Sequence, residues 1–108
     1  LAETDLRLPR VPNDFISSWA QYTVMLPDRF DRAKIQSLLR QSDIPSMVYY
    51  QRPMHEQKAF FGKSLVVGGC PKTKKACETV LSLPMGPYLN KTQCDIVCDA
   101  LQNILILD

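Results

Sequence analysis

The fold is decided by the stretch Val80-Leu81-Ser82-Leu83-Pro84-Met85-Gly86-Pro87-Tyr88-Leu89, which reads as an apolar strand followed by a proline-rich turn. Residues 80–83 form a short apolar run, and Pro84 ends it because proline cannot donate to a sheet ladder. Asn90 and Gln93 follow with the spacing of a capping box, in which two side chains satisfy free backbone N–H groups at a helix start. A strand that leads into a helix is therefore predicted for the last third of the chain.

The residues after Gln93 predict the most regular helix of the chain. Apolar side chains recur there at intervals of three and four residues, which places them on one face of a helix. This face is expected to pack against the rest of the domain. Its members are Cys94, Val97, Cys98, Leu101, Ile104 and Leu105.

Residues 18–26 predict a further strand, because they are rich in aromatic and β-prone side chains and are followed by Pro27. Asp28 is of a type that caps helices, and we expect a helix to start there. Residues 43–45 end that helix at a proline, which restricts the residue before it. The buried stripe expected on this helix consists of Ile35, Leu38 and Leu39.

Between these elements, residues 46–50 predict a short aromatic strand, and Pro53 is expected to open a brief helix through Phe60. A loop over residues 62–69 then precedes a helix from Pro71 to Thr79. This order predicts a two-layer α/β domain, with a short sheet of about three strands and helices packed on one face.

Length and composition limit the classes of protein that the chain fits. Its 108 residues suffice for one domain, and 45% hydrophobic with 22% charged residues is ordinary for a globular protein. The net charge of +2 gives no reason to expect nucleic acid or a membrane surface as partner. No signal peptide and no apolar run of about 20 residues is visible, so we expect a cytoplasmic protein. We expect residues 1–17 to be a tether from a preceding domain and residues 18–108 to form the folded unit.

Four cysteines allow three interpretations, and free, partly buried thiols are the preferred one. Disulfides would suit a secreted protein, for which nothing else in the sequence speaks. A zinc site would require closer cysteine pairs or a partnering histidine, so no metal is expected. The cysteines are Cys70, Cys77, Cys94 and Cys98.

Several segments in a common order resemble the C-terminal part of DegT/StrS-type nucleotide-sugar aminotransferases. Trp19-Ala20-Gln21-Tyr22-Thr23 looks like the strand that opens the small domain of these enzymes. Residues 49–60 are similar to the family's tyrosine, proline, leucine, histidine, glutamine, alanine, phenylalanine pattern, with Met54 in place of leucine. Residues 71–85 match the family's helix-to-strand segment. Departures occur at Lys72, Lys74, Gly86 and the pair Gln51-Arg52.

The resemblance implies the C-terminal small domain of the aspartate aminotransferase fold, from a fold-type I pyridoxal-phosphate enzyme. Such an enzyme would transfer an amino group from glutamate to a nucleotide-linked keto sugar, for a bacterial lipopolysaccharide or other surface polysaccharide. In this family the cofactor lysine, the carboxylate and the phosphate cup lie in the large domain. We therefore expect no catalytic, cofactor-binding or metal-binding residue in this chain, which would be inactive alone. A homodimer is implied as well.

By the same resemblance, His55, Tyr50, Gln57 and Arg52 are expected to contact the substrate. An imidazole can donate to a sugar hydroxyl or a phosphate, and a guanidinium pairs with a diphosphate through its planar fork. The sequence alone also allows His55 to be a surface histidine or one bonded to a backbone carbonyl. Of Tyr49 and Tyr50, only one can face the ligand if they alternate along a strand, and Tyr50 lies nearer the strand exit.

A function of a different class stays open beside the transaminase. A stand-alone, non-catalytic binding or interaction module derived from this domain would also carry these motifs. The departures at Lys72, Lys74 and Gly86 favour that alternative, because a domain without catalytic duties is free to change at such positions.

Overall fold

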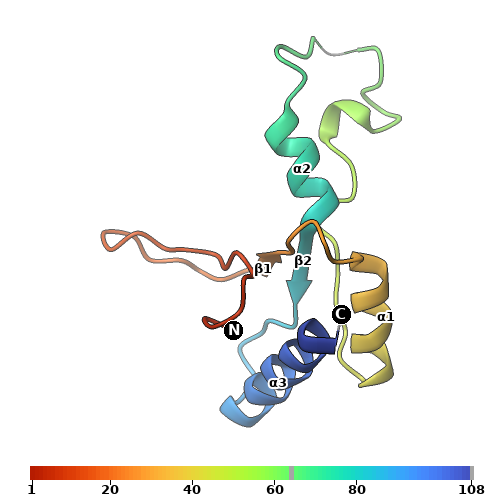
Figure 1. Ribbon diagram of the computed structural model, residues 1–108. Coiled ribbons are helices and arrows are strands. Elements are labelled where there is room, and N and C mark those ends of the chain that lie inside the picture. Colours follow the sequence, from red (N-terminus) through yellow and green to blue (C-terminus); the bar gives the residue numbers. More distant parts are fainter. Residues whose placement is uncertain (64, 108) are drawn as a thin grey trace.

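The computed structural model of the protein describes residues 1–63 and 65–107. Two short strands form the centre, and helices lie beside them and beyond one end (Figure 1). The elements are β1 (Tyr22–Met25), α1 (Arg32–Gln41), the 3₁₀ helix η1 (Met54–Glu56), α2 (Pro71–Thr79), β2 (Val80–Leu83) and α3 (Lys91–Leu107).

The sheet is a two-stranded antiparallel ribbon in which Val24 pairs with Leu81. The predicted α/β class is confirmed, but the predicted third strand over residues 46–50 does not form. Met47 alone joins the sheet, through a bridge in which its N–H donates to Ser82 O at 3.0 Å and its carbonyl accepts from Ser82 N at 2.8 Å. Beyond Met47 the chain turns at Tyr49 and Tyr50 and leaves the sheet edge, so no ladder extends.

The N-terminal segment contributes to the other edge of the ribbon. Arg7 exchanges two backbone hydrogen bonds with Met25, at 3.0 and 3.1 Å, and Leu6 beside it is buried in the core. Residues 9–20 then project as a long loop from the body (Figure 1). The division of the chain at residues 17 and 18 stays a prediction.

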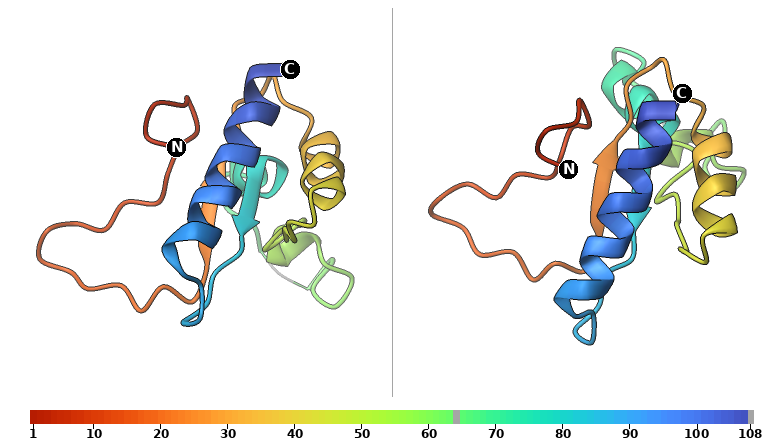
Figure 2. Two further views of the ribbon diagram at one scale, coloured as in Figure 1. Left: turned by 90° about the horizontal axis from the view of Figure 1, so that it is seen from below. Right: turned by 60° about the horizontal axis from the view of Figure 1, so that its bottom comes forward.

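One face of the ribbon carries the core. Val24 and Leu81 are fully buried there, since side chains of paired residues in an antiparallel ladder point to the same side. Helices α1 and α3 pack against this face (Figure 2). Their fully buried side chains are Ile35, Leu39 and Leu101.

Helix α1 starts three residues later than the sequence predicted. Its N-cap is Asp31, whose carboxylate accepts from Ala33 N at 2.8 Å and from Lys34 N at 3.3 Å. Asp28, the predicted cap, lies in a turn closed by Phe30 N donating to Pro27 O at 3.1 Å. This turn delays the start of the helix by three residues, and Asp31, a residue of the type that caps helices, follows the turn directly.

The capping box of α3 is confirmed. The Asn90 side chain accepts from Gln93 N at 2.9 Å, and the Gln93 side chain accepts from Asn90 N at 3.0 Å. The predicted apolar face is buried at Leu101 and Ile104, whereas Cys94, one turn into the helix, is exposed. The first turn of α3 therefore projects beyond the core, and the later turns pack on it.

Helix α2 points away from the body and continues into β2 without an intervening residue (Figure 1). Its predicted start at Pro71 is confirmed, whereas the predicted helix over residues 53–60 is only the single turn η1. Arg32 on α1 ties the end of α2 to the body. Its Nη1 donates to Cys77 O at 2.6 Å and to Val80 O at 3.2 Å.

We expect Leu81→Ala to destabilise the domain by about 2–5 kcal/mol, because it removes a fully buried side chain at the centre of the core. Leu65→Ala is the matched control, since Leu65 is exposed and its truncation should cost less than about 0.5 kcal/mol. Equilibrium urea unfolding measures both. Equal losses in the two variants would contradict the core described above.

Candidate functional site

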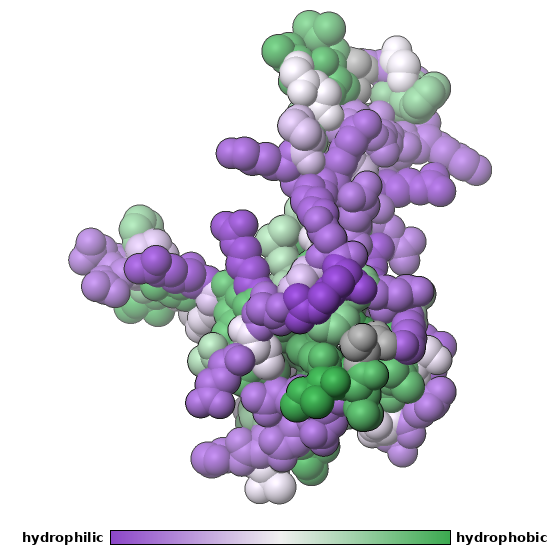
Figure 3. Space-filling model, viewed as in Figure 1, coloured by the Kyte–Doolittle hydropathy of each residue, from purple (hydrophilic) through white to green (hydrophobic). Residues whose placement is uncertain are grey.

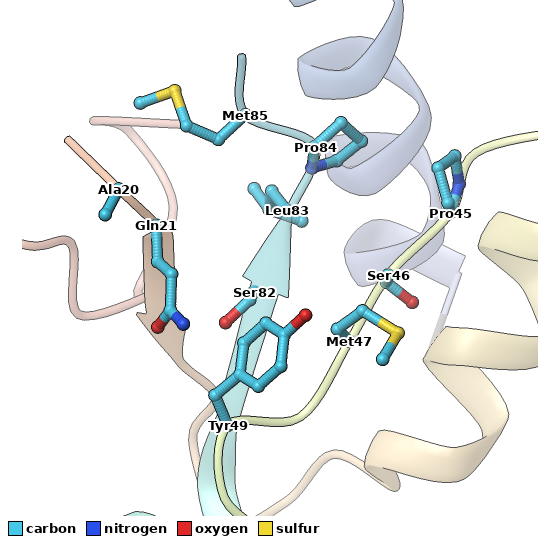
Figure 4. A pocket seen from close by; sticks show the side chains of 10 residues that line it. All are labelled: Ala20, Gln21, Pro45, Ser46, Met47, Tyr49, Ser82, Leu83, Pro84 and Met85. Atoms are coloured by element: carbon cyan, nitrogen blue, oxygen red, sulfur yellow. The ribbon is translucent and has the colours of Figure 1, made fainter.

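The face of the ribbon opposite the core carries a hollow of about 270 Å³. Its floor is polar, because Ser82 lies between Leu81 and Leu83 and its side chain points to the opposite side of the strand. The Ser82 hydroxyl is 2.7 Å from that of Thr23 on the paired strand. The hollow is lined by Ala20, Gln21, Pro45, Ser46, Met47, Tyr49, Ser82, Leu83, Pro84 and Met85 (Figure 4).

Two longer side chains frame this hollow. The Gln21 side chain extends along β1 and the Tyr49 ring lies in front of β2, so that the two flank Ser82 (Figure 4). Together they provide an aromatic face, an amide that can donate and accept, and hydroxyl groups. Such a set suits a ligand with several hydroxyl groups, which needs both donors and acceptors.

The two neighbouring tyrosines differ in their placement. Tyr49 lines the hollow and is 38% exposed, whereas Tyr50 is 67% exposed and lies outside the lining. Their rings meet edge to face, with centroids 5.9 Å apart. The strand on which the two tyrosines were expected to alternate does not form there, since both lie in a turn.

The other predicted site residues lie together on the turn around η1, outside the lining of the hollow. Arg52 is exposed, Gln57 is half-buried, and the His55 side chain is 19% exposed. The structure thus groups Arg52, His55 and Gln57 on one segment and places Tyr50 just before it. Their contact with a substrate stays a prediction.

A charged cluster joins this turn to α2. One carboxylate oxygen of Glu56, Oε1, lies 2.9 Å from Lys74 Nζ and 3.7 Å from His55 Nε2. The first distance is a charge-assisted hydrogen bond, and the second is too long for a hydrogen bond. Lys74 therefore connects the segment that carries His55 to a helix of the scaffold.

The same ion pair shifts the pKa of both of its members. The hydrogen bond from Lys74 lowers the pKa of Glu56, and the positive charges of Lys74, His55 and Arg52 add to this effect. The hydrogen bond to Glu56 in turn raises the pKa of Lys74. Both groups are accordingly held in their charged forms around neutral pH.

Two of the three lysines at the start of α2 form ion pairs with other segments. Lys74 binds Glu56, and Lys75 pairs with Asp28, the residue that was expected to cap α1. Lys72 is exposed. These two pairs connect α2 to the turn around η1 on one side and to the start of α1 on the other.

A site for pyridoxal phosphate requires a lysine amine beside a phosphate cradle, and the expectation that this chain contains none stays a prediction. The hollow that Lys75 lines contains no glycine, and its amine is engaged by Asp28. The hollow that includes Gly86 contains no lysine. Within residues 1–63 and 65–107, no three side chains of the His, Cys, Asp and Glu types gather as metal ligands, and all four cysteines are free thiols.

Sequence analysis missed the polar face of the ribbon and the cluster at Glu56. The signal for the first was present: Ser82 is the polar residue of an apolar run, and Gln21 precedes the paired strand. No sequence signal marks the Glu56–Lys74 contact, because 17 residues separate the partners and the loop between them sets their distance.

The fold and its arrangement are those of an α/β small domain found in aminotransferases. The profile of the DegT/DnrJ/EryC1/StrS aminotransferase family matches residues 1–102. The chain belongs to this family, as its motifs predicted. Across the described residues, no helix combines the length and apolar character needed to cross a membrane.

Relatives in sequence bear aminotransferase names. A UDP-2-acetamido-2-deoxy-3-oxo-D-glucuronate aminotransferase from Pseudomonas aeruginosa is 33% identical over 103 residues, which is 95% of this chain. A UDP-N-acetyl-3-dehydro-alpha-D-glucosamine 3-aminotransferase from Acidithiobacillus ferrooxidans is 31% identical over 105 residues, or 97% of the chain. The chain spans 27% of the length of each of these relatives.

Solved structures of aminotransferases also resemble this chain over about a quarter of their length. A DegT/DnrJ/EryC1/StrS aminotransferase from Brucella abortus superimposes with a TM-score of 0.83 and 31% identity over 92% of this chain. DesV from S. venezuelae, crystallised in complex with a ketimine intermediate, gives 0.81 and 29% over the same share. The chain covers 26% of each of these proteins.

The ion pair between Glu56 and Lys74 predicts how stability depends on pH. The lowered pKa of Glu56 contributes stability that is complete above its unfolded value of about 4.3 and lost as the pH falls through the folded value. The raised pKa of Lys74 contributes stability that is complete below about 10.4 and lost as the pH rises through the folded value.

Lys74→Met should therefore be less stable than the unmodified chain over the neutral range, and the difference should vanish at both acidic and alkaline extremes. Urea unfolding at a series of pH values measures it, with Lys72→Met as control because Lys72 is exposed on the same helix. High salt should also reduce the difference, since exposed pairs are screened. A pH-independent difference would show that the contact contributes packing and not charge.

Proposed function

We propose that the chain is the C-terminal small domain of an aminotransferase that transfers an amino group from glutamate to a nucleotide-linked keto sugar. One observation carries this proposal. Over 92% of its length the chain superimposes on about a quarter of an aminotransferase of the same family, with a TM-score of 0.83. Two relatives that match nearly the whole chain act, by their names, on sugars attached to UDP.

The cofactor would be held by residues outside this chain. Pyridoxal phosphate, bound to the large domain, supplies the electron sink that amino-group transfer requires. The described residues offer it no phosphate cradle beside a lysine, so the chain alone would bind no cofactor and carry out no transfer. Its part would be to bind and orient the sugar nucleotide and to exclude water from the closed site.

The turn around η1 would provide the contacts to the substrate. Arg52 is exposed, and its guanidinium can bind a diphosphate with two parallel hydrogen bonds. His55 can donate to a hydroxyl or a phosphate oxygen, and Tyr50 and Gln57 lie at the ends of the same segment. The Glu56–Lys74 pair supports this role, because it fastens the turn to α2.

The shape of the chain suits a partner domain. Its radius of gyration is 15.7 Å, larger than the roughly 13 Å of a compact chain of this size. Phe15 and Ile16 in the loop of residues 9–20 are exposed, and so are Phe61, Leu65 and Val67 in the segment before α2. Apolar surface is visible toward the ends of both projecting parts (Figure 3). We propose that these ends contact the large domain, in a cytoplasmic homodimer that serves surface-polysaccharide synthesis.

A stand-alone binding module is the second candidate. A protein from Geobacillus stearothermophilus named pleiotropic regulatory protein is 37% identical over 79 residues, which are 73% of this chain and 20% of that protein, and its name states a regulatory role and not a transfer reaction. Lys74 and Gly86 also depart from the family pattern, and Lys74 is engaged in an ion pair with Glu56. A module of this kind would retain the sugar nucleotide and lack the transfer.

The native gene product discriminates between the two candidates. The transaminase predicts a protein several times heavier than 12.3 kDa, which binds pyridoxal phosphate covalently, while the purified 108-residue chain does not. Mass spectrometry of the intact native protein measures its size, and the absorbance of added pyridoxal phosphate reports covalent binding of the cofactor. A native product of about 12.3 kDa, or a covalent cofactor adduct on this chain that disappears when one lysine is replaced, would contradict the proposal.

His55→Ala in the full-length enzyme should weaken binding of the sugar nucleotide about tenfold, or roughly 1.4 kcal/mol, because one hydrogen bond to the ligand is lost. Isothermal titration with a UDP-linked sugar measures the effect. Lys58→Ala is the control, since Lys58 is exposed three residues further along the same segment. Unchanged affinity in His55→Ala, or an equal loss in the control, would remove His55 from the site.

A further inference from the structure

A second hollow, of about 520 Å³, lies between the N-terminal segment, the loop after β2 and the first turns of α3. Most of its lining is apolar. It is separate from the turn around η1, and it shares Leu83, Pro84 and Met85 with the polar hollow. The lining residues that matter here are Leu8, Met85, Leu89, Cys94, Val97 and Cys98.

Three sulfur-containing residues, Met85, Cys94 and Cys98, belong to this lining. Cys94 and Cys98 are both free thiols, the first exposed and the second half-buried. They are four residues apart on α3, so their side chains are neighbours on one helix face, with Cβ atoms about 5–6 Å apart. Met85 adds a thioether from the loop opposite and is 40% exposed.

The spacing of the two thiols disfavours a direct bond between them. A disulfide needs Cβ atoms about 3.5–4.5 Å apart, closer than residues at this helical spacing come. Zinc needs four ligands, and the described residues gather no group of three or more from the His, Cys, Asp and Glu types. A metal ion that binds two thiolates and a weak thioether agrees both with the spacing of the two cysteines and with the small number of ligands.

We propose that this hollow binds a soft monovalent cation, Cu(I), through the sulfur atoms of Cys94 and Cys98, with Met85 as a third ligand. Thiolates and thioethers are the ligands that select Cu(I) over harder cations. Binding forms two Cu–S bonds from the thiols and releases both S–H protons to solvent, with no change in oxidation state. The inference is independent of the proposed transaminase.

The surroundings of the thiols suit such an ion. Leu8, Leu89 and Val97 line the same hollow and make most of its surface apolar, while Tyr22 is the lining residue that carries a side-chain hydroxyl. Asp95, the carboxylate next to Cys94, is bound to Lys91 through a hydrogen bond of 2.7 Å. The remaining cysteines are elsewhere, since Cys70 precedes α2 and Cys77 is buried within it.

The test is an anaerobic titration of the purified, reduced protein with Cu(I), in competition with a chromophoric Cu(I) chelator. We expect one site that is lost in Cys94→Ser and in Cys98→Ser and kept in Cys70→Ser. Met85→Leu should weaken it by about tenfold, the scale on which supporting groups change metal affinity. X-ray absorption should report only sulfur ligands.

Serine preserves the size of cysteine, and circular dichroism of each variant verifies that its helices are intact. Three results would overturn the proposal. They are the absence of a Cu(I) site in the unmodified protein, an equal loss of binding in Cys70→Ser, and a site that persists in the Cys94→Ser/Cys98→Ser double variant.

Discussion

The pairing of Val24 with Leu81 is the constraint on which the rest of the domain depends. A two-stranded ribbon is only marginally stable in water by itself, because it cannot cover its own apolar face. Here α1 and α3 cover that face with Ile35, Leu39 and Leu101, all fully buried. Within residues 1–63 and 65–107, the buried side chains of α1 and α3 belong to the same core as those of the ribbon, so ribbon and helices become stable together.

The same strand register also determines the polar hollow on the opposite face of the ribbon. Because side chains alternate along a strand, fixing Leu81 on the core side fixes Ser82 on the other. Ser82 then meets Thr23 across the ribbon, and the polar hollow forms over them. If the register of the two strands shifted by one residue, the hydroxyl groups would be buried and the leucines exposed. The hollow and the core therefore both depend on the strand register.

Local signals predicted the elements well wherever the deciding groups are close in sequence. The capping box of Asn90 and Gln93 is one example, since both groups lie within one helical turn. The strand over residues 80–83 was predicted from its own apolar composition and the proline after it, although its partner strand is distant in sequence. Asp28 was mistaken for the cap of α1 because two suitable aspartates lie three residues apart, and the turn between them decides. The third strand failed for a related reason: its composition is suitable, but the chain turns away after Met47.

For the site, sequence similarity indicated the segment that carries His55, whereas the position of that segment follows from contacts between distant residues such as Glu56 and Lys74.

The direct passage from α2 into β2 has a mechanical consequence. With no linker between Thr79 and Val80, and with Arg32 holding the carbonyls of Cys77 and Val80 together, the helix and the strand form one stiff rod. The turn with His55 is fastened near the outer end of this rod, and the core surrounds its inner end. A displacement of the turn around η1 would therefore be transmitted to the centre of the sheet, because no flexible linker separates α2 from β2.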